Sequence, residues 1–165
     1  MRKLGMIPAL MLASALLAGA ASAQTLIVLN KSDHEAALVN PATLEVTARL
    51  ATGKGPHEVA VSSDGRMAYV TNYGSYGVMR PGEQRQEPGE TITVLDLKAR
   101  KVAATWKLGE YKRPHGIVVS RDGKRLWVTV EENKAVLEME TSSGKILKAW
   151  KTEQETSHMV LPTLD

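Results

Sequence analysis

The chain has 165 residues, contains no cysteine and no phenylalanine, and carries a formal net charge of +3 at pH 7. Without cysteine it cannot form disulfides or attach a c-type haem covalently, so its stability must come from packing alone. Aromatic residues make up only 4% of the chain, so the core must be built from Val, Leu, Ile and Ala, a composition that favours β-strands.

In chain order, the first predicted element is a secretory signal peptide over residues 1–23. Two basic residues precede an apolar run over residues 7–18, and the small residues Ala-Ser-Ala at 21–23 form a cleavage site. The apolar run is shorter than the ~20 residues that a membrane span needs, which disfavours the alternative of a retained anchor. We therefore expect a mature chain over residues 24–165, periplasmic or secreted, with no membrane span.

The charge of this expected mature chain argues against a nucleic-acid partner. Removing the signal peptide takes away Arg2 and Lys3 and no acidic residue, which lowers the formal net charge from +3 to +1. A nucleic-acid-binding domain normally carries a strong basic field, and none remains here. The remaining length suits one ordinary domain.

Two phrases of the sequence recur along the mature chain, which predicts a repeat architecture. The first phrase is PHEVAVSSDG from Pro56, PHGIVVSRDG from Pro114 and SHMVLPTLD from Ser157. The second is LVNPATLEVTARL from Leu38, VLDLKARKVAATW from Val94 and LEMETSSGKILKAW from Leu137. His115 and His158 are 43 residues apart, so the period is about 43 residues. The longer interval of 58 residues between Pro56 and Pro114 is explained by an insertion over residues 73–90, rich in Gly, Pro and polar residues.

Within one repeat the local signals predict four short strands. In chain order we expect strands over residues 59–61, 67–71, 91–97 and 102–108, with a Ser-Asp-Gly turn between the first two. Helices are disfavoured because no run reaches 10–12 residues and Gly or Pro bounds each one. Four antiparallel strands in about 43 residues are typical of one blade of a β-propeller.

The residues that carry these strands resemble a known family. AYVTN at 68–72, TVLDLKARKVAATWKLG from Thr93 and PHGIVVSRDGKRLWVTV from Pro114 are similar to the YVTN-repeat β-propeller family, which is related to WD40-like and haem-d1-type propellers. The resemblance implies an all-β fold of four-stranded blades, usually seven in a closed ring. Residues 24–165 supply only about three blades, so we expect a truncated member whose open blade edges invite self-association.

Three histidines recur at the start of the first strand of successive repeats. Equivalent positions of successive blades converge on the propeller axis, so His57, His115 and His158 are expected together at the mouth of the central channel. His34 is expected on the same face, further out. Imidazole is the commonest metal ligand, so the three histidines predict a metal site, with zinc or copper as candidates. The alternative is structural: Pro-His serves only as the entry to the first strand, each ring hydrogen-bonding a neighbouring blade.

Basic residues flank two of these histidines. Lys54, Lys112 and Arg113 are predicted to add affinity for an anionic ligand. No catalytic residues are predicted, because no GxSxG nucleophile elbow occurs, and Asp64 and Asp122 lie in Asp-Gly turns.

Three hypotheses for function follow. The favoured one is an exported binding module for a small-molecule or protein ligand, with a metal or anion site at the channel mouth. The second is implied by the resemblance: a propeller oxidoreductase or hydrolase of the haem-d1, quinoprotein or lactonase type. The third is a structural repeat protein of the cell envelope, which predicts no site. On balance the sequence argues against an enzyme, because no acid–base constellation stands out.

Overall fold

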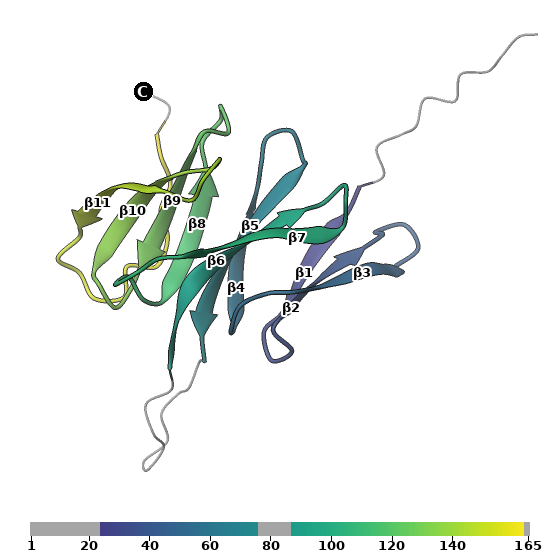
Figure 1. Ribbon diagram of the computed structural model, residues 1–165, viewed down its shortest axis with the longest axis horizontal. Coiled ribbons are helices and arrows are strands. Elements are labelled where there is room, and N and C mark those ends of the chain that lie inside the picture. Colours follow the sequence, from purple (N-terminus) through teal and green to yellow (C-terminus); the bar gives the residue numbers. More distant parts are fainter. Residues whose placement is uncertain (1–23, 76–86, 164–165) are drawn as a thin grey trace, which may run out of the picture.

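Eleven strands in three antiparallel sheets make up the part of the chain that the computed structural model describes, residues 24–75 and 87–163 (Figure 1). The first sheet contains β1 (Leu26–Asn30), β2 (Glu35–Val39) and β3 (Val46–Ala51). The second contains β4 (Pro56–Val61), β5 (Met67–Gly74), β6 (Pro88–Asp96) and β7 (Lys101–Lys107). The third contains β8 (Pro114–Val119), β9 (Arg125–Val130), β10 (Ala135–Glu140) and β11 (Ile146–Lys151).

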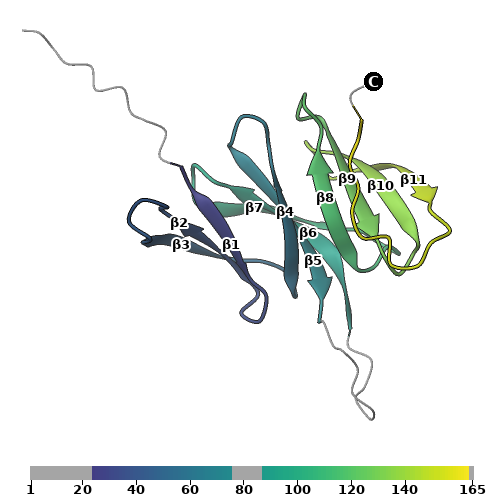
Figure 2. The same cartoon turned by 180° about the vertical axis from the view of Figure 1, so that it is seen from behind.

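Each sheet is a meander in which strands pair in chain order, as in a propeller blade. The three sheets, here called blades 1 to 3, stand side by side with blade 1 at one end and blade 3 at the other (Figures 1 and 2). This arrangement confirms the prediction of an all-β fold and a partial β-propeller. The described blades do not close into a ring.

The repeated Ser-x-Asp-Gly phrase forms the turn between the first two strands of blades 2 and 3. The hydroxyl of Ser62 donates to the carboxylate of Asp64 over 2.6 Å, and Gly65 follows with a φ of +68°. Ser120 and Asp122 repeat the same 2.6 Å hydrogen bond. Both aspartates are therefore turn residues, as the sequence suggested, because their carboxylates satisfy the turn rather than face a cleft.

The predicted insertion over residues 73–90 begins and ends inside strands, which corrects its boundaries. Tyr73 and Gly74 continue β5, because their N–H groups donate to the carbonyl oxygens of Gly55 and Lys54 over 3.0 and 2.9 Å. Gly74 then pairs with Pro88, the first residue of β6. Residues 76–86, the central part of the predicted insertion, lie outside the described residues.

The hydrophobic core lies between the blades. Successive residues of a strand point to opposite faces of its sheet, so alternate positions of β5 contact different neighbours. Ala68 and Val70 pack toward blade 1, whereas Tyr69 packs toward blade 3. The cluster between blades 2 and 3 is the larger and includes Leu126 and Leu137. These contacts between blades therefore fix the relative positions of β4 and β8, the first strands of blades 2 and 3.

The predicted signal peptide over residues 1–23 lies outside the described residues, so it stays a prediction. In the described ranges, 24–75 and 87–163, there is no helix with the length and apolar character that a membrane crossing requires.

Candidate functional site

Three histidines from successive repeats lie in a row, with neighbouring rings tilted by 45° and 46° to one another. His57 is the second residue of β4, His115 is the second residue of β8, and His158 lies in the segment after β11. The ring centroids of His57 and His115 are 4.0 Å apart, and those of His115 and His158 are 3.9 Å apart. The structure thus brings together the three side chains that the repeat predicts at one place. We call them the histidine row.

A β-bulge at the start of each inner strand aims the histidine. In β4, His57 and Glu58 together oppose the single residue Thr71, because the register shifts there by one residue. The same shift occurs in β8 at His115. A bulge bends the strand and redirects its side chains, so two consecutive residues such as His57 and Glu58 can face the same site.

Buried threonines on the second strands hold the backbone of each following histidine. Thr71 Oγ1 donates to the carbonyl oxygen of His115 in the next blade over 2.8 Å. Thr129 Oγ1 donates in the same way to the carbonyl oxygen of His158 over 2.9 Å. The threonine of the YVTN phrase, and its counterpart in WVTV, therefore link one blade to the next at the histidine row.

Replacing Thr71 by valine should lower the free energy of unfolding by about 1–3 kcal/mol, because the carbonyl of His115 loses its buried donor. Urea denaturation measures the difference. Thr105→Val, the same change at an exposed position of β7, is the control and should change stability by less than about 0.5 kcal/mol. Equal losses in the two variants would contradict a linking role for Thr71.

A second row of side chains lies beside the histidines. Lys31, Tyr73 and Glu131 occupy equivalent positions, each one residue beyond Asn30, Asn72 and Val130, which end the matching LIVLN, AYVTN and LWVTV phrases. The Lys31 ammonium lies 5.3 Å from the centre of the Tyr73 ring, and the Tyr73 hydroxyl donates to Glu131 Oε2 over 2.5 Å.

This second row, here called the flanking row, contacts the first through Tyr73 and Glu131. The Tyr73 ring lies 5.2 Å from the His57 ring and 5.4 Å from the His115 ring, centroid to centroid. Sequence comparison between repeats missed the flanking row, because its three members share a position and not a residue type. The signal that would find it is the position itself, immediately after each YVTN-like phrase.

His115 is the most enclosed member of the histidine row, with only 2% of its surface exposed. Its Nε2 lies 3.8 Å from Glu131 Oε1, whereas its Nδ1 is buried without a hydrogen-bond partner. Burial, and then the neighbouring His57 and His158 rings, lower the pKa of His115 to about 4. Burial followed by the charge of Lys31 also lowers the pKa of His57. His115 is therefore neutral at pH 7, and its lone pair is available.

The arrangement offers a set of metal-ligating atoms. One ligand atom each from His57, Glu58 and His115 lie within 4.8 Å of one another. His57 Nδ1 and Glu58 Oε1 are 3.6 Å apart. Sequence reasoning did not select Glu58, because Gly116 and Met159 stand at its place in the other repeats. His158 lies outside this three-residue group and contacts it through the His115 ring.

His34, the fourth histidine, has a different environment. Its Nδ1 accepts a hydrogen bond from the backbone N–H of Gly55 over 3.1 Å. It lies in the turn between β1 and β2 with a φ of +55°, so its backbone and its ring serve the join between blades 1 and 2.

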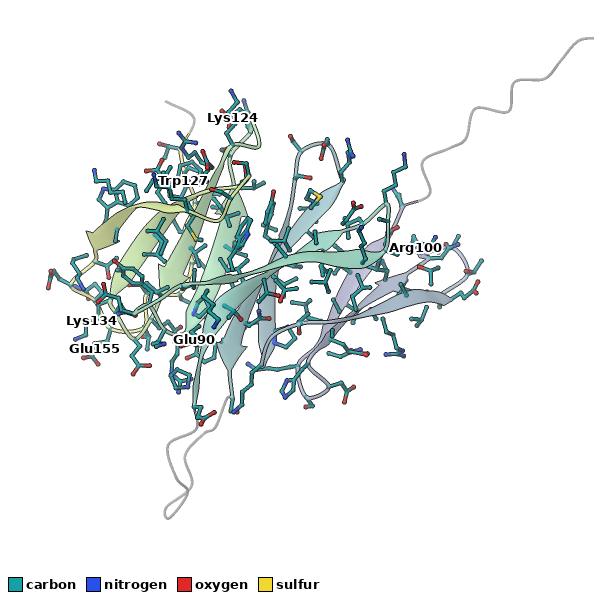
Figure 3. The ribbon with its side chains drawn as sticks, viewed as in Figure 1. Glu90, Arg100, Lys124, Trp127, Lys134 and Glu155 are labelled. Atoms are coloured by element: carbon teal, nitrogen blue, oxygen red, sulfur yellow. The ribbon has the colours of Figure 1, made fainter. Side chains whose placement is uncertain are left out.

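The two lysines predicted to bind an anion each pair with an acidic side chain. Lys54 Nζ lies 3.3 Å from Glu87 Oε2. Lys112 forms an ion pair with Glu90, which Figure 3 labels, and also donates to the carbonyl oxygen of Gly109 over 3.1 Å. Each lysine thus forms an ion pair with a different glutamate. That either lysine binds an anionic ligand stays a prediction.

Arg113, the third predicted anion ligand, lies closer to the histidine row. Its guanidinium carbon is 5.1 Å from the centre of the Tyr73 ring, and its Nε is 3.7 Å from Glu132 Oε2. A cleft of about 340 Å³ opens beside it, lined by Tyr73, Arg113, Glu131, Glu132, Lys134, Glu155 and Thr156. Two of these lining residues, Lys134 and Glu155, form an ion pair of 2.8 Å (both labelled in Figure 3). Arg113 therefore lines this cleft together with Tyr73 and Glu131 of the flanking row.

Comparisons with known proteins support the fold. The model of the YNCE-like beta-propeller family matches residues 3–81. Curated proteins yielded no match. The chain is similar to the solved structure of hydrazine synthase from Kuenenia stuttgartiensis, with a TM-score of 0.66 and 25% identity, covering 82% of this chain and 34% of that one.

A second similar structure is that of the dihydro-heme d1 dehydrogenase NirN in complex with DHE. The TM-score is 0.62 and the identity 18%, covering 77% of this chain and 24% of that one. The chain spans about a third of the length of the hydrazine synthase chain and about a quarter of the NirN chain. At these identities the two structures inform the fold.

Proposed function

Because the chain folds as a partial β-propeller, we propose that it is an exported binding module that holds a divalent transition metal, zinc or copper(II), at the histidine row. One observation carries the proposal: ligand atoms of His57, Glu58 and His115 lie within 4.8 Å of one another. His57 and Glu58 belong to blade 2, whereas His115 belongs to blade 3, so a bound ion would tie the two blades together.

The surroundings of His115 suit a metal ligand. Metal-bound histidines usually direct their second ring nitrogen toward a carboxylate, which fixes the ring and raises its basicity. Here Nε2 of His115 faces Oε1 of Glu131, and the other oxygen of Glu131 accepts a hydrogen bond from the Tyr73 hydroxyl. That arrangement leaves Nδ1, buried and without a hydrogen-bond partner, as the lone-pair donor. Two imidazoles and a carboxylate are ligands that zinc and copper(II) both accept.

The proposed ion would have room for a further ligand. Three protein ligands leave one position of a tetrahedral zinc site open, as in zinc sites that bind an exogenous molecule. Arg113 and Lys31 lie next to the same Tyr73 ring and supply positive charge nearby. We therefore propose a small anionic ligand as the molecule that the loaded site binds, with Arg113 in the role that the sequence assigned to it.

Calorimetric titration of the metal-free protein with zinc chloride and copper(II) chloride tests the site. Wild type should bind about one ion of either metal per chain, and His115→Ala should weaken binding by at least about tenfold. His34→Ala is the matched control and should bind as wild type does, because His34 Nδ1 is already engaged by Gly55. Equal, weak heats for wild type and His115→Ala would contradict a metal site. They would favour the alternative in which the histidines serve only the fold, as in a structural repeat protein of the cell envelope.

We also propose that the protein is periplasmic or secreted. The motivation is the charged, apolar and small-residue order of residues 1–23. Expressed in a secreting bacterium, the mature protein should begin at Gln24. Mass analysis of the N-terminus from a periplasmic fraction measures this, and an intact Met1 there would contradict cleavage.

An enzyme is the second candidate. It is favoured by one observation: the two solved structures named above are those of enzymes, a hydrazine synthase and a dihydro-heme d1 dehydrogenase. An absorption spectrum of the protein purified after secretion distinguishes the candidates. A chromophore bound in proportion to the chain would favour a redox enzyme of this kind, whereas a colourless protein that binds zinc would favour the binding module.

A further inference from the structure

Blade 1 contains the second, third and fourth strands of a blade. Its first strand, β1, carries the phrase LIVLN, which matches AYVTN of β5 and LWVTV of β9. In blades 2 and 3 those second strands pair on one side with an inner strand, β4 or β8. Within residues 24–75 and 87–163, β1 pairs only with β2, so its inner edge presents backbone N–H and C=O groups to a further strand.

The segment over residues 157–163 matches such an inner strand in sequence, and the residue just before it matches in backbone conformation. SHMVLP aligns with PHEVAV of β4 and PHGIVV of β8. The residue two positions before each histidine is left-handed, with φ values of 62°, 56° and 53° at Gly55, Arg113 and Thr156.

Hydrogen bonds also hold this segment as they hold β8. The hydroxyl of Thr129 and the N–H of Gly116 both donate to the carbonyl oxygen of His158, over 2.9 and 3.0 Å. A Cβ on Gly116 would lie 2.4 Å from that oxygen, so this close approach requires glycine. Beyond His158 the segment is open: Met159 is 64% exposed and Leu161 is 82% exposed.

We propose that residues 157–163 of one copy add to the inner edge of β1 of a second copy, completing a four-stranded blade and joining the two chains head to tail. Strand addition to an open sheet edge gains affinity from main-chain hydrogen bonds and specificity from alternate side chains. The register follows from the other blades: Val59 opposes Val70 in blade 2, and Ile117 opposes Val128 in blade 3. The equivalent pair is Val160 of one copy and Val28 of the other.

Side chains on both faces of the new contact fit this pairing. In blade 2, Val70 is buried against its neighbour, whereas Val28, at the same place in blade 1, is 44% exposed. Leu26 and Val46 are exposed on the same face of blade 1. In the joined pair this face meets the outer face of blade 3, where the Trp150 ring is also exposed. Burying apolar surface on both sides would stabilise the contact.

The join would also extend the candidate site. Tyr73 follows the second strand of the blade that contains His57, and its ring lies 5.2 Å from that histidine. In the completed blade, Lys31 of the second copy takes the equivalent position relative to His158. A second copy would thus contribute a positive charge beside the last histidine of the row.

Cross-linking between two single-cysteine variants of the whole chain tests the proposal, because the natural sequence contains no cysteine. Val28→Cys and Val160→Cys are purified separately, mixed in buffer with EDTA and treated with a short bifunctional maleimide. We expect a product of two chains, and mass spectrometry of its peptides should show residue 28 linked to residue 160. Because each chain carries one cysteine, this link can only join two copies.

The matched control mixes Val28→Cys with Val102→Cys, a valine of similar exposure on the outer strand β7. This mixture should give at least about tenfold less linked product. Circular dichroism establishes that each variant is folded before mixing. Equal yields in the two mixtures, or a monomer by light scattering at the cross-linking concentration, would overturn the proposal. EDTA keeps the result independent of the metal site.

Discussion

Replacing Leu137 by alanine is expected to lower the free energy of unfolding by about 3–5 kcal/mol, the range for a leucine truncated in a packed core. Leu137 lies on β10 with none of its surface exposed, in the cluster that joins blades 2 and 3. The substitution leaves a cavity that the surrounding strands can fill only in part. Urea denaturation followed by circular dichroism measures the loss.

Leu147→Ala is the matched control for this change. Leu147 lies on β11 and is 40% exposed, so its truncation should cost less than about 1 kcal/mol. The comparison asks whether packing between blades, rather than pairing within each blade, holds the described fold together. A loss at Leu137 no larger than that at Leu147 would show that the blades are stable independently of their contact.

The metal-free protein is expected to lose about 3 kcal/mol of stability through His115 as the pH falls from about 6.5 to about 4. The folded chain holds this imidazole neutral, since burial and the two neighbouring histidines lower its pKa to about 4. The unfolded chain binds the proton near pH 6.5. Above about pH 6.5 the imidazole is neutral in both the folded and the unfolded chain, so no stability is lost through it. Below about pH 4 it is protonated in both, so the free energy of unfolding falls no further through this residue.

Measuring this effect requires a difference between variants, because several carboxylates also titrate below pH 5. Unfolding free energies of wild type and His115→Asn, taken in EDTA at pH 7 and pH 4.5, give the pH slope that belongs to this ring. Thr105→Val, the exposed β7 variant used above as a control, changes no titratable group and should keep the wild-type slope. A wild-type slope in His115→Asn would show that this histidine is not held neutral by the fold.

Much of the architecture could be predicted from the two repeated phrases. The Pro-His pairs mark the start of β4 and β8, and the Ser-x-Asp-Gly turns separate the first two strands of blades 2 and 3. Repetition also predicts that His57, His115 and His158 lie together, because equivalent residues of neighbouring blades are neighbours in space. These inferences needed only position within the repeat, which a single sequence supplies.

The rest of the candidate site could not be predicted, because it depends on contacts between positions where the repeats differ. Glu58 faces the site through a bulge, and a bulge changes the alternation of side chains without a sequence signal of its own. Lys31, Tyr73 and Glu131 differ in chemistry, so comparing the repeats hides their shared position. Lys112 was predicted to bind an anionic ligand because it lies near His115 in sequence; its ammonium pairs with Glu90, a contact that sequence adjacency does not reveal.

The threonine that holds the next histidine has a consequence for how such a site evolves. Thr71 fixes His115, and Thr129 fixes His158, by the same hydrogen bond from one repeat to its successor. Each repeat therefore carries both a histidine and the anchor for the following one. Duplicating one unit of about 43 residues would lengthen the row by one imidazole with its support already in place. Copy number, as well as point substitution, would then set how many imidazoles the row contains.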